Sequence, residues 1–283
     1  MLDILRPDAD RWLPLVLDSP HSGSQYPSDF GFSIDHQVLR RSEDAFVDEL
    51  FAPVTRLGGT FVHARFPRCY IDPNRADTDI DLTMIAGQWP HPVKPSGKIA
   101  RGSGLIWKQV KQYGAIYDRL LSCEEVQARI EQCWAPYHQA VSQILHEAHE
   151  RAGVVIHLNC HSMASSGDNT TEDGSVRRAD FVLGNLDGAS CDDEVLQVVA
   201  STLQSFGYQV AINDPYKGQE LIRRYSDPND GKHSLQIEIN RALYMDEQQI
   251  KKTAGFKQLQ EHLFQVSSAL ASLASARRRP ETL

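Results

Sequence analysis

The chain has 283 residues, with 29 Lys and Arg against 37 Asp and Glu and a formal net charge of −8. This acidic balance argues against a nucleic-acid-binding surface, and no apolar stretch approaches the roughly 18 residues of a membrane span. The N-terminal residues are too charged for a secretory signal, and the cysteines have no regular spacing. We therefore expect a cytoplasmic protein that binds neither nucleic acid nor membrane; the composition leaves the oligomeric state open.

The first predicted strand is the apolar run Leu15–Leu17, and a loop containing Pro and Gly follows it and carries His21. Because Pro and Gly interrupt regular structure, we expect His21 at a strand-to-loop junction. Residues 33–56 then have helical spacing with an expected break near Ser42. Ser42 suits a helix N-cap, and the acids at positions 43 and 44 suit a helix N-terminus. This capping role is the structural interpretation of both acids.

A second strand is predicted at Thr60–Ala64, after two glycines that end the helical run. Residues 68–75 form a polar segment in which Pro73 fixes the backbone just before an amide and a guanidinium. Residues 77–104 hold many Asp, Gly and Pro with little periodicity, which predicts a long loop. A loop of that length inside a compact domain is usually functional or mobile.

Residues 122–151 begin with a capping box and have one apolar face, which predicts a long helix that Pro136 should kink. The next segment, 154–163, starts as a β-branched apolar run typical of a buried strand. It ends in polar residues that include His161, before a loop at 165–175. Because ligands collect beyond the carboxyl ends of such strands, His161 occupies a position where a functional histidine is expected.

The remaining predicted elements are strands at 181–183, 209–212 and 234–240 and helices at 192–206 and 246–276. Strands that alternate with helices predict an α/β fold with a mixed central β-sheet and helices on both faces. We find no internal repeat and no linker. Residues 1–283 are therefore predicted to form a single domain, with a flexible tail at 277–283.

His21, His161 and a carboxylate near position 44 together make a sufficient ligand set for a catalytic zinc ion. Each histidine alone is more often structural, and the long, irregular spacing does not identify a metal site by itself. Glu238 alternates with apolar neighbours in its strand, so it is a candidate for the base that takes a proton from water. A solvated strand carboxylate is the alternative. For Cys160, a small buried thiol is favoured over a nucleophile.

Several short motifs resemble the N-formylglutamate amidohydrolase family, and they occur in the same order over about residues 13 to 250. They are Ser-Pro-His-Ser-Gly at 19–23, Ile-Asp-Pro-Asn-Arg at 71–75, His-Ser at 161–162, Asp-Gly-Ala-Ser-Cys at 187–191, Gln-Ile-Glu at 236–238 and Tyr-Met-Asp-Glu at 244–247. The resemblance implies a core shared with zinc carboxypeptidases, of the phosphorylase/hydrolase-like kind. It also implies cleavage of N-formyl-L-glutamate to formate and glutamate in histidine breakdown.

Carried over position by position, the resemblance implies a role for each matching residue. The metal ligands would be His21, Asp44 and His161, and Glu238 would be the general base. Arg68 would polarise the scissile carbonyl, and Asn74 and Arg75 would bind a carboxylate of the substrate. Glu43 is the alternative ligand to Asp44. Arg223, alone or with Lys217 or Arg224, would bind a second carboxylate. Guanidinium groups suit this role because they grip a carboxylate with two parallel hydrogen bonds.

The chain departs from the family pattern at Asn159, where an Asp is usual, and in the segment 84–110, which has no match. If residue 159 orients a ligand histidine, Asn159 could still accept its hydrogen bond. We predict a zinc-dependent amidohydrolase with one zinc per chain and a small N-acyl amino acid as substrate, foremost N-formyl-L-glutamate. The alternatives are the same machinery acting on another N-acyl amino acid or small peptide, and a non-catalytic protein that binds an acidic metabolite.

Overall fold

The computed structural model describes residues 1–167 and 176–279, and its centre is a seven-stranded sheet in the order β1-β3-β2-β8-β11-β9-β10. The strands are β1 (Leu2–Leu5), β2 (Leu15–Ser19), β3 (Thr60–Ala64), β8 (Val155–Met163), β9 (Phe181–Gly184), β10 (Val210–Ile212) and β11 (Lys232–Asn240). Strands β3, β2, β8 and β11 run parallel, whereas β1 and β9 are antiparallel to β3 and β11. The predicted mixed sheet is confirmed, and β1 is a strand that the sequence patterns missed.

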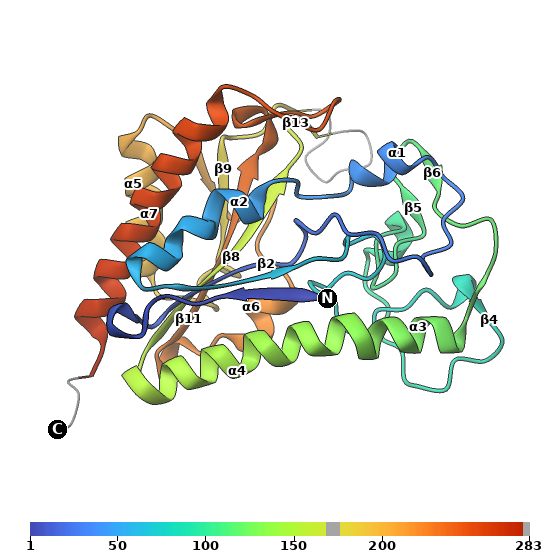
Figure 1. Ribbon diagram of the computed structural model, residues 1–283, viewed down its shortest axis with the longest axis horizontal. Helices are drawn as coiled ribbons and strands as arrows, with labels where there is room; N and C mark the ends of the chain where they lie inside the picture. The colour runs from blue at the N-terminus through green and yellow to red at the C-terminus, as the bar shows by residue number, and fades with distance from the viewer. Residues whose placement is uncertain (168–175, 280–283) are drawn as a thin grey trace.

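Helices cover both faces of this sheet (Figure 1). One face carries α2 (Val47–Phe51), α5 (Asp193–Ser205) and α7 (Gly255–Arg277), and the other carries α4 (Ala135–Ala152), which continues from α3 (Cys123–Arg129). The shorter elements are α1 (His36–Arg40), α6 (Glu220–Tyr225), β4 (Ile85–Ala86), β5 (Gln109–Val110), β6 (Gly114–Ala115), β7 (Leu121–Ser122), β12 (Met245–Asp246) and β13 (Lys251–Lys252). Among the helices of the described residues, none is long and apolar enough to cross a membrane.

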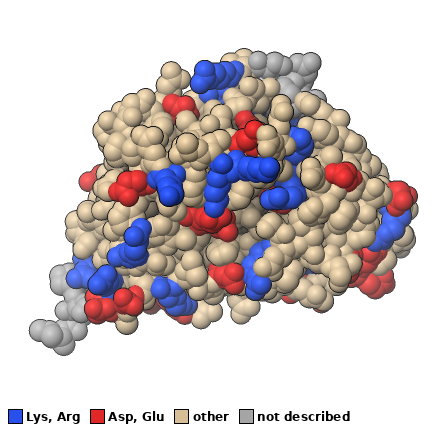
Figure 2. Space-filling model, turned by 45° about the horizontal axis from the view of Figure 1, so that its top comes forward, with Lys and Arg blue, Asp and Glu red and all other residues tan. Residues whose placement is uncertain are grey.

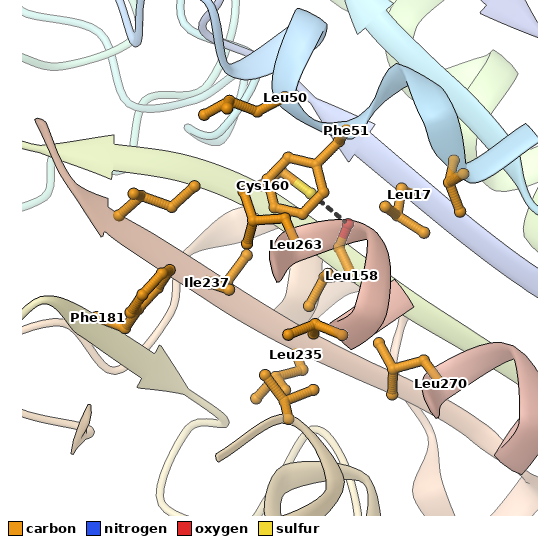
Figure 3. Close-up of a cluster of buried hydrophobic side chains, with 14 of the residues drawn as sticks. Leu17, Leu50, Phe51, Leu158, Cys160, Phe181, Leu235, Ile237, Leu263 and Leu270 are labelled. Atoms are coloured by element: carbon orange, nitrogen blue, oxygen red, sulfur yellow. Dashed lines mark hydrogen bonds between the residues drawn. The ribbon is translucent and has the colours of Figure 1, made fainter. Parts of the chain in front are cut away.

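The face of the sheet under α2, α5 and α7 is apolar, and Figure 3 shows part of this core. Leu158 and Cys160 of β8 and Leu235 and Ile237 of β11 contribute to it. The Cys160 thiol donates a hydrogen bond to the Leu158 carbonyl, with Sγ and O 3.4 Å apart. Burial raises the pKa of this thiol well above its usual range, so Cys160 is a core residue rather than a nucleophile.

The opposite face of the same strands is polar and lies under α4. Because side chains alternate along a strand, the residues between the core positions of β8 and β11 point to this face. They are His157, Asn159, His161, Ser234, Gln236 and Glu238, and all six are buried. Tyr137 of α4 reaches across to Asp18 of β2, donating a hydrogen bond of 2.6 Å. A buried polar face must satisfy its own hydrogen bonds, and the candidate site lies within it.

The predicted break in the helical run near Ser42 is confirmed, but the prediction that Ser42 is an N-cap is wrong. Its hydroxyl donates to the carbonyl of Leu39, 2.6 Å away, near the end of α1. The next helix begins only at Val47, after Phe46 in a left-handed conformation with φ of 67°. The acids at positions 43 and 44 therefore lie between two helices, where their side chains are available for long-range contacts.

The predicted start of the last helix needs correction. The last helix begins at Gly255, not at Asp246, because the Asp246 carboxylate accepts hydrogen bonds of 2.8 Å from two backbone N–H groups that follow it. Such local bonds form a turn that competes with a helix. The kink predicted at Pro136 stays a prediction: the long helix continues through this position, and a π-helical turn at Ile130–Trp134 joins α3 to α4 just before it.

The predicted long loop at 77–104 is confirmed as mostly irregular. Its regular parts are β4 and the single-turn 3-10 helices Leu82–Met84 and Ile99–Arg101. Of the loop predicted at 165–175, residues 168–175 lie outside the described residues, as do residues 280–283 of the predicted tail. Arg277 is the last residue of α7 and forms an ion pair of 2.8 Å with Asp192.

Arg129, at the end of α3, is a buried cation within a cage of aromatic rings. Its guanidinium lies 4.2 Å from the centroid of the Tyr70 ring and also faces Phe30 and Tyr117. Nη1 donates to the Tyr70 carbonyl at 3.1 Å and to the Tyr117 hydroxyl at 2.7 Å, and Nη2 donates to the Phe30 carbonyl at 3.3 Å. These contacts tie the helix to the segment 68–75, which carries several predicted site residues.

We predict that Arg129→Met lowers the free energy of unfolding by about 3 kcal/mol, because it leaves two buried carbonyl groups without donors. Urea unfolding followed by circular dichroism measures the loss. Arg119→Met is the matched control: Arg119 is 41% exposed and pairs with Glu125 at the surface, so its removal should cost no more than about 1 kcal/mol. Equal losses in the two variants would contradict the role given to Arg129.

Candidate active site

Three buried side chains from distant parts of the chain meet at one point: His21 just after β2, Asp44 between α1 and α2, and His161 near the end of β8. The Nδ1 atoms of the two histidines are 3.0 Å apart. Asp44 Oδ2 lies 3.2 Å from His161 Nδ1 and 3.4 Å from His21 Nδ1. The structure thus brings together the three residues that the sequence singled out as a ligand set.

This triangle of atoms has the dimensions of a metal site. Ligand atoms about 2.0–2.1 Å from a tetrahedral metal ion lie roughly 3.3–3.4 Å from one another. The observed separations of 3.0, 3.2 and 3.4 Å are close to that spacing. Two imidazoles and one carboxylate also leave a fourth coordination position open, as catalytic sites require. The residues present therefore fit a divalent metal ion.

Asp72 holds His21 in the tautomer that a metal ligand needs. His21 Nε2 donates to Asp72 Oδ1 across 2.6 Å, which leaves the Nδ1 lone pair available. Burial alone would raise the pKa of Asp72, but the contact with the His21 imidazole and the charges of Arg68 and Arg75 outweigh it and hold the pKa well below its usual range. Asp72 is absent from the predicted site residues; its place directly before Pro-Asn-Arg was the one available signal.

Asp44 presents one oxygen to the histidines and the other to arginines. Arg241 Nη2 donates to Asp44 Oδ1 at 2.9 Å, and Arg68 Nη1 lies 3.5 Å from the same oxygen. Burial would raise the pKa of Asp44, but its contacts with the imidazoles of His161 and His21 and the charge of Arg68 hold the pKa well below its usual range. Asp44 is therefore ionised, with Oδ2 toward the imidazoles. Arg241 follows β11 directly and is another residue that the sequence patterns missed.

The neighbouring acid, Glu43, has partners on the other side. Its carboxylate accepts hydrogen bonds from the Tyr26 hydroxyl at 2.8 Å and from Arg40 Nε at 3.3 Å. The backbone N–H of Asp44 donates to the His21 carbonyl at 2.9 Å, which holds the two loops together. Of the two acids considered for the ligand set, the structure therefore brings Asp44 to the histidines and Glu43 to other partners.

Gly23 explains the tight loop that carries His21. A Cβ atom on Gly23 would lie 2.2 Å from the Phe66 carbonyl oxygen, much closer than van der Waals contact permits. The loop after β2 can therefore lie directly against the segment after β3. This close approach brings His21 next to the start of the segment that carries Asp72.

Glu238 on β11 pairs with His161 of β8 in the register of the sheet, and it is buried. Gln236 Nε2 donates to Glu238 Oε1 at 3.0 Å. Burial raises the pKa of Glu238; His161 and Arg68 oppose this shift, and the charge of Asp44 adds to it. Glu238 is therefore not a solvated strand carboxylate. Two nearby carboxylates with pKa values shifted in opposite directions are the arrangement expected of a metal ligand and a proton-transfer base.

A cavity of about 730 Å³ opens beside these groups, and His21, His161 and Glu238 line part of it. Its cationic residues are Arg41, Arg68, Arg75, Lys98, Arg101, Lys111, Arg178, Lys217 and Arg241. Its carboxylates are Glu238 and Glu247. Figure 2 shows several Lys and Arg side chains gathered near the middle of one face of the molecule. The cavity thus concentrates positive charge in a chain whose net charge is −8, which favours an anionic ligand.

Arg68 is fixed in this cavity by an acid and a ring. Its Nη2 donates to Asp72 Oδ2 at 3.0 Å, and its guanidinium lies 4.9 Å from the centroid of the Trp107 ring. Burial would lower the pKa of Arg68, but the charges of Asp72 and Asp44 raise it. A guanidinium held in this way stays charged and keeps one orientation beside the triangle of His21, Asp44 and His161.

Asn74 and Arg75 also line the cavity, but most of their hydrogen bonds go to the protein. Asn74 Oδ1 accepts the backbone N–H of Leu221 at 3.0 Å, and its Nδ2 lies 3.2 Å from His161 Nε2. Arg75 donates from Nε to the Ser103 carbonyl at 3.1 Å and from Nη1 to the Asn74 carbonyl at 2.8 Å. The Arg75 Nη2 atom stands 4.0 Å from an oxygen of Asp72, at the limit of an ion pair.

The structure does not bring Arg223 to the cavity. Its side chain is 60% exposed on α6 and lies 3.9 Å from Glu220, because the helix turns this position toward solvent. Arg224, one of its suggested helpers, pairs with Glu220 at 2.6 Å and is 38% exposed. The other, Lys217, does line the cavity. The predicted second carboxylate site at Arg223 therefore needs correction.

Comparison with known proteins gives consistent matches. Residues 13–245 match the family model described as N-formylglutamate amidohydrolase. The chain is 29% identical over 239 residues to N-formylglutamate deformylase of Pseudomonas putida, covering 83% of each protein. Among solved structures, N-formylglutamate amidohydrolase from Ralstonia eutropha JMP134 is 43% identical, with a TM-score of 0.92 and coverage of 97% of this chain and 98% of that one. The Agrobacterium tumefaciens gene product Atu2144 shares the fold, with 18% identity, a TM-score of 0.67 and coverage of 96% of this chain and 94% of that one.

We predict that Glu238→Gln stabilises the metal-free protein at neutral pH. Because the pKa of Glu238 is raised above its unfolded value, its ionised form destabilises the fold at every pH above the raised value. The variant should therefore melt at a higher temperature than the unaltered protein near pH 8. The difference should vanish as the pH falls below the ordinary carboxyl pKa of about 4.3. Differential scanning fluorimetry with chelator present checks this, and a lower melting temperature of the variant near pH 8 would contradict it.

Proposed function

The chain belongs to the N-formylglutamate amidohydrolase family, and from this we propose that it hydrolyses N-formyl-L-glutamate to formate and L-glutamate. The observation that carries the proposal is the triangle of His21, Asp44 and His161 beside Glu238, in a cavity rich in cations. A metal-binding group, a buried base and positive charge for a dianionic substrate are the parts that such a hydrolysis needs.

We propose zinc as the metal, with one ion per chain. Two imidazoles and a carboxylate with one open position form the ligand set typical of zinc hydrolases. When bound, zinc supplies Lewis acidity toward water and toward a carbonyl oxygen. We also place the protein in the cytoplasm, which its five free cysteines suit, and in histidine breakdown, in keeping with its family.

Glu238 is the proposed general base. Its carboxylate accepts a proton from the attacking water and then returns that proton to the departing amine nitrogen. Burial raises the pKa of Glu238, which makes the carboxylate more basic and better matched to this transfer. Gln236 donates to Oε1 of Glu238, so the side chain is held in one orientation throughout.

Arg68 is proposed to stabilise the oxyanion that forms from the amide carbonyl. It lines the cavity, and Asp72 and Trp107 already hold its guanidinium in place. A donor held before the reaction needs little reorganisation as charge develops, which is the main source of such stabilisation.

Arg75 is proposed to bind one carboxylate of the substrate, with Asn74 contributing a hydrogen of its Nδ2 group. Arg75 is nearly fully buried, and with Asp72 4.0 Å away its charge is only partly balanced by that acid. Arg178 and Lys217 line the cavity, whereas Arg223 does not, so we propose these two cations for the second carboxylate of the substrate. A substrate with two carboxylates would then be held at both ends.

We predict that Asp44→Asn lowers zinc affinity by at least about 100-fold. Loss of a residue that only hydrogen-bonds to a metal ligand typically lowers metal affinity about 10–100-fold, and loss of a ligand itself should lower it more. Competition with a chromophoric chelator measures the affinity. Glu43→Gln is the matched control at the adjacent position, and its zinc affinity should stay close to that of the unaltered protein. A loss confined to Glu43→Gln would transfer the ligand role to Glu43.

We predict that Arg75→Lys raises the KM for N-formyl-L-glutamate about 30-fold, since a lost charge-assisted hydrogen bond costs about 2 kcal/mol. A formate-release assay provides the kinetics. Arg223→Lys, outside the cavity, should change KM little. The same assay on N-acetyl amino acids and dipeptides tests the alternative substrates, for which a cavity of about 730 Å³ has room. Faster turnover of one of those compounds would replace N-formyl-L-glutamate as the substrate.

A further inference from the structure

A series of buried polar side chains extends from His161, on the side of its ring away from His21 and Asp44. His161 Nε2 is 2.7 Å from Asn159 Oδ1, two residues earlier on the same face of β8. Asn159 Nδ2 in turn donates to Asp18 Oδ1 on the neighbouring strand β2, also at 2.7 Å. Asp18 and Asn159 are paired in the register of the sheet, and both are completely buried.

Asp18 is ionised in this setting. Burial alone would raise its pKa, but hydrogen bonds from His157, Tyr137 and Asn159 outweigh it and lower the pKa. The His157 Nε2 and Tyr137 hydroxyl contacts measure 2.9 and 2.6 Å. Because an ionised carboxylate only accepts hydrogen bonds, Asp18 allows Asn159 a single orientation. Nδ2 of Asn159 faces Asp18, so its Oδ1 faces His161.

The orientation of Asn159 decides where His161 carries its proton. Oδ1 can only accept, so the proton sits on Nε2 of His161 and the Nδ1 atom keeps its lone pair. Nδ1 is the atom that faces His21 and Asp44. With the amide reversed, Nδ2 would face Nε2 and favour the other tautomer, in which Nδ1 carries a proton and cannot bind a metal.

A competing contact makes this control necessary. Asn74 Nδ2 lies 3.2 Å from the same Nε2 atom of His161. The Asn74 amide cannot be reversed without losing the bond from the Leu221 N–H to its Oδ1, which measures 3.0 Å. An amide nitrogen at this place favours a proton-free Nε2, which is the tautomer unable to bind metal through Nδ1. The shorter contact to Asn159, backed by a full negative charge, opposes it.

We propose that Asp18 is a positioning residue of the metal site, which acts through Asn159 to hold His161 in its metal-binding tautomer. The other ligand, His21, receives a carboxylate directly from Asp72. For His161, the carboxylate of Asp18 lies one side chain further away. It orients the Asn159 amide, whose oxygen then accepts the proton of His161 Nε2. This inference rests on the proposed metal site, and its test separates the two.

The test is the zinc affinity of four proteins, measured by chelator competition at one pH: the unaltered chain, Asp18→Asn, Asn159→Asp and the double variant. Each single variant should bind zinc about 10–100-fold more weakly. Asp18→Asn removes the charge that orients the amide. Asn159→Asp sets two carboxylates against each other at a contact that now spans 2.7 Å. The double variant restores one carboxylate and one amide, so its zinc affinity should return to within about threefold of that of the unaltered chain. If the two substitutions acted independently, their losses of affinity would instead add.

Asn185→Asp is the control, since Asn185 is also a buried amide, and its oxygen accepts from the Gly188 N–H at 3.0 Å, away from the histidines. Its zinc affinity should be unchanged. A double variant that binds zinc no better than the weaker single variant would overturn the inference, as would single variants that bind as tightly as the unaltered chain. If the single variants fail to fold, the double variant alone decides: a zinc affinity within about threefold of the unaltered chain supports the inference, and a loss of about 10-fold or more overturns it. Absence of zinc binding by the unaltered chain would instead overturn the metal site itself.

Discussion

A metal ion at the candidate site requires that the two buried histidines carry no proton on their Nδ1 atoms. An imidazole meets that condition when an oxygen accepts the proton on its other nitrogen, and both ligands have such an oxygen, from Asp72 and from Asn159. These acceptors come from a loop after β3 and from β8 itself. The metal-binding geometry is therefore a consequence of the order of strands β3, β2 and β8 in the sheet, and not of any local sequence motif.

Such a site buries several charged side chains together, and the structure places opposite charges next to one another. Arg68 lies between two acids, with Nη2 3.0 Å from Asp72 and Nη1 3.5 Å from Asp44, and Arg241 completes the neutralisation of Asp44. Buried ion pairs seldom add net stability, because desolvation offsets their attraction. Burial of the apolar residues on the opposite face of the sheet is therefore the main source of stability, while the polar face carries the charged groups of the candidate site.

The sequence predicts an element correctly where its pattern is typical of one kind of structure. It does not predict contacts that depend on how separate strands, helices and loops pack together. Strict alternation at 234–240 predicted the strand and the face to which Glu238 points, but not that this carboxylate would be buried beside His161 and Asp44. Asp18 and Asp72 look like ordinary acids at strand and loop ends, and only the folded sheet shows what they contact. Arg223 is predicted to bind a second carboxylate, yet the phase of a helix as short as α6 sets which residue points inward.

The central claim is that one metal ion bound by His21, Asp44 and His161 enables hydrolysis of N-formyl-L-glutamate. The most direct measurement is formate release by the protein as purified, after removal of metal with a chelator, and after addition of one equivalent of zinc. We predict that formate release stops on chelation and returns with zinc. Release that continues unchanged in the metal-free protein would contradict the role of the metal ion.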